Sequence, residues 1–314
     1  MKTRILTFVL ALLALLIIPA AASAKLTVGI GENSPGMFSD PLFSQLGAKH
    51  SRVVVSWNVV AKNDDELLRV GDYLEGARVT GVTPLVTFEH GRGDATICNK
   101  KKNRKKAQCV LPKPKQYEAA LRAFKARFPT VRSIVPWNEV NHFTQPTSRN
   151  PKAAARFTKI ARKVFKGSTV MDVDMLDQAN NPSAKRPKFT SLARYAKRFT
   201  KALGGKRKIC GIHNYSDINR FRTTGTKAIM KGLKCKQYWL TEVGGIYQFG
   251  PFKASQKRQL KATKFMFKSA RKNKKVTRLY VYTWFGGVTS RFDAGLVAGG
   301  KARSSYAVVR KNTK

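Results

Sequence analysis

Short apolar runs alternate with helical patterns along most of the chain. The runs are rich in Val, Ile, Tyr and Thr and show no sustained polar alternation, which is typical of strands buried on both faces of a sheet. We predict eight parallel strands, in residues 26–31, 51–57, 83–90, 132–139, 168–175, 208–215, 237–245 and 278–287.

Helical segments separate most of these runs. Asn63-Asp64-Asp65-Glu66 is a good helix start, because a capping side chain is followed three residues later by a glutamate. Asn150 and Pro151 supply a cap and a proline at the first helical position. Further helices are predicted in residues 117–128, 190–203, 223–233 and 255–272, and the weakest one around 41–46.

Eight strand–helix units in one chain predict an α/β protein with a single (β/α)₈ TIM barrel. An open doubly wound sheet is the alternative, and it usually carries a glycine-rich phosphate loop after its first strand. Here that place reads GIGENSPGMF, without the third glycine in position and without a clear helix behind it. No linker-like segment interrupts the pattern, so we predict one domain over residues 25–314.

Residues 1–24 have the pattern of a secretory signal peptide. Lys2 and Arg4 precede an apolar run of 14 residues, and Ala22-Ser23-Ala24 forms a cleavage site. An uncleaved membrane anchor is the alternative, but a span needs ~20 residues. We expect cleavage near Ala24, an exported, extracellular protein and no membrane span afterwards.

The four cysteines fall into two near pairs, Cys98 with Cys109 and Cys210 with Cys235. An even number suits an exported protein, and each disulfide would stabilise the fold by roughly 2–4 kcal/mol. Zinc is the other interpretation, but no C-x-x-C occurs and the histidines do not cluster with the cysteines in sequence. We expect no metal and no cofactor.

The charge is strongly basic, with 61 Lys and Arg against 17 Asp and Glu, which gives +44. Nucleic acid is the first partner class that such a charge suggests. Most of the basic residues, however, lie on the polar faces of predicted helices, and no RRM, KH or zinc-finger signature is present. We expect a solvated basic surface that attracts anionic polymers, weakened by salt, and no specific nucleic-acid partner.

In a barrel the active site lies at the carboxyl ends of the strands. Glu139 ends the fourth strand and Glu242 the seventh, and these two strands face each other across the barrel mouth. Two carboxylates that flank a glycosidic bond are what glycoside hydrolysis needs. Indole, imidazole, amide and phenol groups at other strand ends suit a carbohydrate cleft; they are Trp57, His90, Asn138, His213, Tyr215 and Trp284.

Four of these motifs, in chain order, resemble the clan A glycoside hydrolases, a superfamily of retaining (β/α)₈ enzymes. They are N-E at the fourth strand, H-x-Y at the sixth, E at the seventh and W at the eighth, and the resemblance spans the whole mature chain. It implies that Glu139 is the acid/base, that Glu242 is the nucleophile and that Asn138 binds the sugar 2-hydroxyl.

The resemblance extends to the supporting residues. Tyr215 would donate a hydrogen bond to the nucleophile, and Trp284 would form the floor of the glycone subsite. Arg52 resembles the inward arginine of the clan, which orients the nucleophile. His90 and His213 resemble the histidines of the third and sixth strands.

The mechanism that this implies is double displacement, with carboxyl groups about 5–5.5 Å apart. Arg52 and Tyr215 would favour the ionised form of Glu242. Glu139 must start protonated, so we expect its surroundings to raise its pKa.

Asp172 and Asp174 lie two residues apart in the fifth strand, so alternation predicts that both face the same side. A metal site with Asp177 is conceivable there, but no glycine-rich D-x-D-G loop supports it.

The segment KKKNRKK, residues 100–106, lies between Cys98 and Cys109 after the third strand. A solvated basic run is one interpretation, and a clamp for an anionic glycan or cell-wall polymer is the other. Two further functions stay open. The protein could be a catalytically silent carbohydrate- or polyanion-binding protein. It could also be an exported nucleic-acid-binding protein, a hypothesis that only the charge supports. We expect a monomer.

Overall fold

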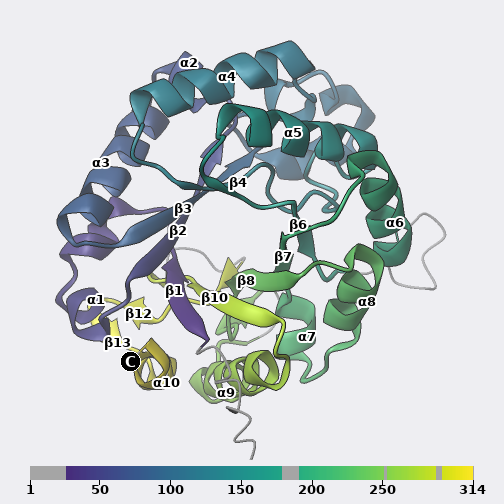
Figure 1. The fold of residues 1–314 in the computed structure, drawn as a ribbon. Coiled ribbons are helices and arrows are strands. Elements are labelled where there is room, and N and C mark those ends of the chain that lie inside the picture. Colours follow the sequence, from purple (N-terminus) through teal and green to yellow (C-terminus); the bar gives the residue numbers. More distant parts are fainter. Residues whose placement is uncertain (1–25, 179–190, 251–252, 288–291, 314) are drawn as a thin grey trace, which may run out of the picture.

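The computed structural model describes residues 26–178, 191–250, 253–287 and 292–313, and a ring of helices surrounds a cylinder of strands (Figure 1). The predicted signal peptide, residues 1–24, lies outside the described residues. Among the described helices, none is long and apolar enough to cross a membrane.

All nine strands of the main sheet run parallel, in the order β5-β4-β3-β2-β1-β10-β8-β7-β6. The sheet closes because its two edge strands come from one predicted run: only Met171 and Asp172 separate β5 from β6. Met171 N donates to Ile134 on one side, and Asp172 N donates to Ile209 on the other. The strands are β1 (Thr27–Gly31), β2 (His50–Ser56), β3 (Thr83–Glu89), β4 (Ser133–Val135), β5 (Thr169–Val170), β6 (Val173–Leu176), β7 (Ile209–His213), β8 (Gln237–Val243) and β10 (Val276–Tyr282).

Each predicted strand position is therefore occupied, and the barrel is confirmed. The helices are α1 (Pro41–Leu46), α2 (Val59–Lys62), α3 (Asp65–Val79), α4 (Pro114–Arg127), α5 (Pro151–Val164), α6 (Leu192–Leu203), α7 (Tyr215–Asn219), α8 (Thr224–Leu233), α9 (Gln256–Lys272) and α10 (Ser304–Thr313). Short accessory elements are η1 (Pro35–Ser39), η2 (Ala95–Asn99), η3 (Lys101–Asn103), η4 (Ala107–Cys109), β9 (Gln248–Phe249), β11 (Phe292–Asp293), β12 (Val297–Ala298) and β13 (Lys301–Ala302).

The helix starts follow local chemistry. Asn150 caps α5 as predicted, because its side chain accepts a hydrogen bond from Ala153 N at 3.0 Å. Asp64, rather than Asn63, caps α3 by accepting from Glu66 N. Glu66 does not complete a capping box, since its side chain accepts instead from Ser56 N, at the end of β2.

The apolar core has two parts. One fills the inside of the barrel, and the other, much larger, lies between the strands and the helices. The inner part consists of Leu85, Val135, Met171, Trp239 and Tyr280. Because these side chains fill the lower interior, polar groups gather at the carboxyl ends of the strands.

Both predicted disulfides form in the structure. Cys98–Cys109 joins η2 to η4 in the loop after β3. Cys210–Cys235 ties β7 to the turn that follows α8.

Candidate active site

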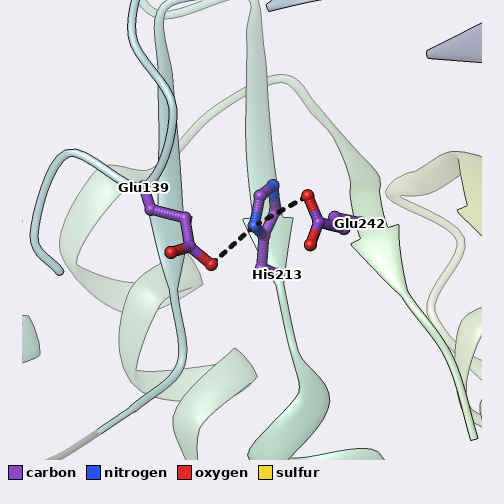
Figure 2. Close-up of side chains that lie close together, drawn as sticks. All are labelled: Glu139, His213 and Glu242. Atoms are coloured by element: carbon purple, nitrogen blue, oxygen red, sulfur yellow. Dashed lines mark hydrogen bonds and ion pairs between the residues drawn. The ribbon is translucent and has the colours of Figure 1, made fainter. Parts of the chain in front are cut away.

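Three groups meet at the carboxyl ends of the strands: Glu139 just after β4, His213 at the end of β7 and Glu242 in β8 (Figure 2). One carboxylate oxygen from each glutamate and one nitrogen of His213 lie within 4.8 Å of one another. A separation of at most 4.8 Å between these two oxygens fits the ~5–5.5 Å between carboxyl groups of retaining glycosidases better than the ~6.5–9.5 Å of inverting ones.

Glu242 is held by two donors. The Arg52 guanidinium, which is 1% exposed, donates from Nη1 to Oε2 at 2.6 Å. The Tyr215 hydroxyl donates to Oε1 at 3.1 Å. Both contacts stabilise negative charge on the carboxylate and fix its direction.

Glu139 has a left-handed backbone, with φ of 39°. Such a conformation costs roughly 1–3 kcal/mol for a residue other than glycine and persists only where its surroundings fix it. Here Asn138 N donates to Phe88 at 2.7 Å, and Val140 N donates to Asp174 at 3.0 Å. The hydrogen bonds on both sides of Glu139 therefore aim its side chain into the mouth.

Asn138 and His90 lie beside a further carboxyl group, that of Glu89. Asn138 accepts from Arg52 Nη2 at 2.8 Å and donates to Glu89 at 3.4 Å. His90 Nε2 lies 3.7 Å from the same carboxylate. Burial raises the pKa of Glu89, and the nearby Glu139 charge adds to the rise, while His90 and Asn138 oppose it.

His213 connects Glu139 to a buried aspartate. Its Nδ1 lies 2.9 Å from Glu139 Oε1 and its Nε2 lies 3.0 Å from Asp174 Oδ2. Burial by itself lowers the pKa of this imidazole, but the charges of Asp174 and Glu242 and the bonds to Asp174 and Glu139 raise it to about 10. At neutral pH His213 is therefore a cation that donates to both carboxylates.

The structure corrects our expectation for Glu139. Burial raises the pKa of this carboxyl group, but the His213 hydrogen bond and the charges of His142 and His213 outweigh burial and lower it. In the free site the transferable proton therefore resides on His213. His142, which lies 3.6 Å from Glu139 Oε2, is a site residue that our residue assignment missed, although it stands only three positions after Glu139.

Asp174 is a second residue of the site that we did not predict for catalysis or substrate binding. It is fully buried and also accepts from the Thr241 hydroxyl, and His213 outweighs the effect of burial so that the pKa of Asp174 is lowered. Asp172 does not share its face, because the strand is interrupted between β5 and β6: Asp172 instead pairs with Arg162 of α5 and accepts from Lys208 N. Asp177 accepts from two backbone N–H groups, so these aspartates form no metal cluster.

Glu139, His213 and Glu242 are close enough to share a metal ion, but their existing partners do not favour one. Both nitrogens of His213 already serve carboxylates, and a metal ligand must be a neutral imidazole with a free nitrogen. The Arg52 guanidinium also occupies Glu242. The set fits a proton-carrying hydrogen-bond network better than a metal centre.

The prediction that Trp284 forms a sugar platform disagrees with its position. Trp284 is fully buried; its ring packs against Phe43 and Tyr306, and its Nε1 donates to Asp40. Tyr282, two residues earlier and the last residue of β10, is instead partly exposed. Burial and then the Glu242 charge raise the pKa of its phenol, so the phenol lies within range of the charge on the nucleophile candidate.

The remaining indole predicted for the cleft, Trp57, is partly exposed just after β2. Its backbone N–H donates to Glu89 O at 3.0 Å, so it lies next to the Glu89 side of the mouth. The Nε1 atom is buried without a hydrogen-bond partner among the described residues.

These positions predict opposite outcomes for two aromatic substitutions. Tyr282→Ala should raise KM by about tenfold, equivalent to about 1.4 kcal/mol, and change stability little. Trp284→Ala should lower the free energy of unfolding by ~3–5 kcal/mol, because it empties a packed core site. Steady-state kinetics and urea unfolding of both variants check this, and a KM effect confined to Trp284→Ala would refute the assignment.

The pair Asp174–His213 also predicts a pH effect on stability. A histidine whose pKa rises from 6.5 to about 10 on folding stabilises the protein fully below pH 6.5, and this contribution is lost as the pH rises towards 10. Asp174→Asn should cost roughly 3–5 kcal/mol at neutral pH and flatten this slope. Urea unfolding from pH 6 to 10 is the measurement, with the exposed Glu75→Gln as control; an unchanged slope in Asp174→Asn would contradict the pairing.

Solved glycosidase structures share this fold. A β-glucosidase from Thermotoga maritima in complex with castanospermine has a TM-score of 0.58 and 13% identity, over 87% of this chain and 84% of that one. An uncultured Clostridium sp. β-glucuronidase has a TM-score of 0.56 at 13% identity, over 92% of this chain and 50% of that one. A β-D-glucuronidase from Dictyoglomus thermophilum has a TM-score of 0.56 at 12% identity, over 91% and 50%.

No family model and no curated protein matches the chain. The chain spans about half the length of these β-glucuronidases. It has the barrel fold of the β-glucosidases and β-glucuronidases. Because a fold does not determine an activity, any activity must be inferred from the side chains of this chain.

Proposed function

We propose that this protein is an exported retaining glycoside hydrolase that cleaves O-glycosidic bonds of a polysaccharide or oligosaccharide. The observation that carries the proposal is the pair of carboxylates within 4.8 Å across the barrel mouth. Their partners differ: Glu242 faces Arg52 and Tyr215, whereas Glu139 faces His213. This asymmetry supports Glu242 as the nucleophile and Glu139 as the acid/base.

In the first step a Glu242 oxygen attacks the anomeric carbon, and the bond from that carbon to the leaving oxygen breaks. The leaving oxygen takes a proton from Glu139, which receives one from His213 Nδ1 along the 2.9 Å contact. Because Asp174 holds the other side of the ring, the imidazole stays in place while the proton moves.

In the second step Glu139 removes a proton from water, and the water oxygen attacks the anomeric carbon of the glycosyl-enzyme. The Glu242 carboxylate leaves, and two inversions give overall retention. The proton taken from water restores the His213–Glu139 pair. No metal or cofactor enters either step.

The proposal includes export, with cleavage near Ala24 and a monomeric mature protein. Two disulfides among the described residues suit an oxidising compartment. A +44 charge disfavours self-association through repulsion and attracts anionic polymers.

The proposed substrate is an anionic glycan or cell-wall polymer. The loop closed by Cys98–Cys109 follows β3, the strand that ends beside Glu89 and His90 on the catalytic face. Two of the similar structures are β-glucuronidases, and a glucuronide carries an acidic sugar. Among the loop residues whose exposure is described, the exposed cations are Lys100, Lys102, Arg104, Lys105 and Lys106.

This loop predicts a salt effect. Activity on an acidic glycan should fall about tenfold between about 0.05 and 0.5 M NaCl, because salt screens exposed charges. Replacing these five of the six loop cations by glutamine should remove most of that dependence. The matched control replaces five exposed cations on and just after α5: Lys152, Arg156, Lys159, Lys163 and Lys166. Equal salt responses in the two variants would reject the clamp.

The proposed function is tested by a hydrolysis screen of aryl β-glycosides and polysaccharides, with the wild type beside Glu139→Ala and Glu242→Ala. Turnover by the wild type that both substitutions abolish or reduce supports the proposal. Binding of glycans without turnover would favour a silent binding protein on an enzyme scaffold. If the protein bound only polyanions, in a salt-sensitive way, its function would be electrostatic binding of polyanions.

A further inference from the structure

A second concave site lies on the outer wall of the barrel, away from the catalytic mouth. α6 packs against α8, and α9 packs against α10. Between α8 and α9 there is instead a cavity of about 580 Å³, within the size range of small-molecule sites. Figure 1 shows these two helices outside β8, and Leu240 of β8 lines the cavity.

The walls of this α8–α9 groove are largely apolar. Leu240, Ala270 and Val276 are buried side chains that line it, and Phe221 and Phe265 meet edge to face with ring centroids 5.7 Å apart. Phe221 is 40% exposed, which is unusual for so large an apolar ring.

Phe221 also has a strained backbone. Its φ is 54°, a left-handed value that bulky side chains rarely adopt. The described non-glycine residues with positive φ are Asn63, Glu139, Phe221 and Lys234, and of these Phe221 lines the groove. Phe221 follows the C-cap of α7, where a left-handed residue commonly ends a helix, and Arg222 N donates back to Asp217 O at 2.9 Å. This turn brings the Phe221 ring to the groove.

All ionisable side chains that line the groove are cationic. They are Arg222, Lys227, Lys268, Lys272 and Lys274, and no acidic residue joins them among the described lining residues. All five are exposed, and Arg222 has a carboxylate partner in Asp217, at 3.5 Å. The groove thus combines an apolar floor with a positive rim.

One polar atom at the groove lacks a partner. Asn214 is 2% exposed, and its Oδ1 has no hydrogen-bond partner in the described part of the chain, although its Nδ2 donates to Thr226 at 3.3 Å. A buried carbonyl oxygen requires a donor, such as water or a hydroxyl group. An anionic head group is not such a donor, so we expect it to contact the rim lysines and not Asn214.

We propose that the α8–α9 groove binds an amphiphilic anion, a carboxylate with a hydrocarbon chain. The chain lies against Phe221, Phe265 and Leu240, and the carboxylate lies among the rim lysines. A neutral amphiphile would leave the rim unused, and a hydrophilic polyanion would leave the apolar floor exposed. The site does not depend on the proposed glycosidase activity.

The test is a calorimetric titration of the full-length protein with acetate, hexanoate, octanoate and decanoate, below their micelle concentrations and at low salt. Each added methylene should tighten binding about fourfold, from ~0.8 kcal/mol per buried methylene. Decyltrimethylammonium, with the same chain and the opposite charge, should bind at least tenfold more weakly than decanoate. Binding that is independent of chain length, or equal for both head groups, would overturn the proposal.

Variants place the binding in this groove. Lys268→Glu with Lys272→Glu should weaken decanoate binding at least tenfold, whereas Lys257→Glu with Lys264→Glu, an identical charge change on the same helix outside the groove, should not. Ser269→Trp should also block binding, because it fills the cavity while leaving the lysines in place. Equal losses in both charge variants, or polyphosphate binding as tightly as decanoate, would show an effect of charge alone and reject the site.

Discussion

Glu242→Ala is expected to reduce hydrolysis of an aryl β-glycoside by about 10⁴-fold or more, because no other group can form the glycosyl-enzyme. Added azide should restore turnover and give the α-glycosyl azide, since it attacks from the space that the carboxylate leaves. The Arg52 guanidinium and the Tyr215 hydroxyl, which normally contact Glu242, remain to border that space. The measurement is the rate with and without azide, together with NMR of the azide product.

Glu139→Ala provides the matched comparison. With a good aryl leaving group the glycosyl-enzyme still forms, and azide then displaces Glu242 to give the β-glycosyl azide. The two variants therefore yield opposite anomers. An α-azide from Glu139→Ala, or a β-azide from Glu242→Ala, would reverse or abolish the role assignment.

Arg52→Met is expected to destabilise the fold by roughly 3–5 kcal/mol, because it leaves buried carboxylates without their cation. Arg52 lies 2.6 Å from Glu242 and 3.6 Å from Asp174, and it also donates to Asn138. Activity should fall with stability, since the same guanidinium orients the nucleophile. Urea unfolding and kcat/KM measure the two effects.

Two further substitutions make this prediction specific. Arg52→Lys keeps the charge but lacks the planar fork, so it should recover part of the stability and little of the activity. Arg78→Met removes an exposed cation paired with Glu75 and should change neither measurably. An Arg52→Met protein as stable as the Arg78→Met protein would contradict the buried network.

Much of the fold follows from local sequence signals. The β-branched runs predict all the strand positions because parallel strands are buried on both faces. The break between β5 and β6 was not predictable, since it depends on Met171 pairing with β4 while Asp172 pairs with β7. Because of that break, Asp172 and Asp174 do not face the same side, contrary to what strand alternation predicts. The helix α10, which buries Tyr306 and Val309, is not among the predicted helices, because it follows the last strand and does not connect two strands.

In the candidate site, too, some features follow from the sequence and others do not. Positions at strand ends bring Glu139, His213 and Glu242 together, because topology alone fixes which strand ends meet. Side-chain environment does not follow from position: Trp284 is packed in the core, whereas Tyr282, at the end of β10, is partly exposed. The pKa of Glu139 depends on a contact between residues 74 positions apart, which no local pattern encodes.

Hydrolysis with retention of the anomeric configuration, through the Glu139–Glu242 pair, is tested most directly by the anomeric configuration of the first sugar released. Proton NMR of a β-glycoside during its first minutes of hydrolysis, before mutarotation, gives this configuration. We expect the β-anomer, because two displacements occur at the same carbon. Initial release of the α-anomer would mean that water attacks directly, and it would contradict a covalent role for Glu242.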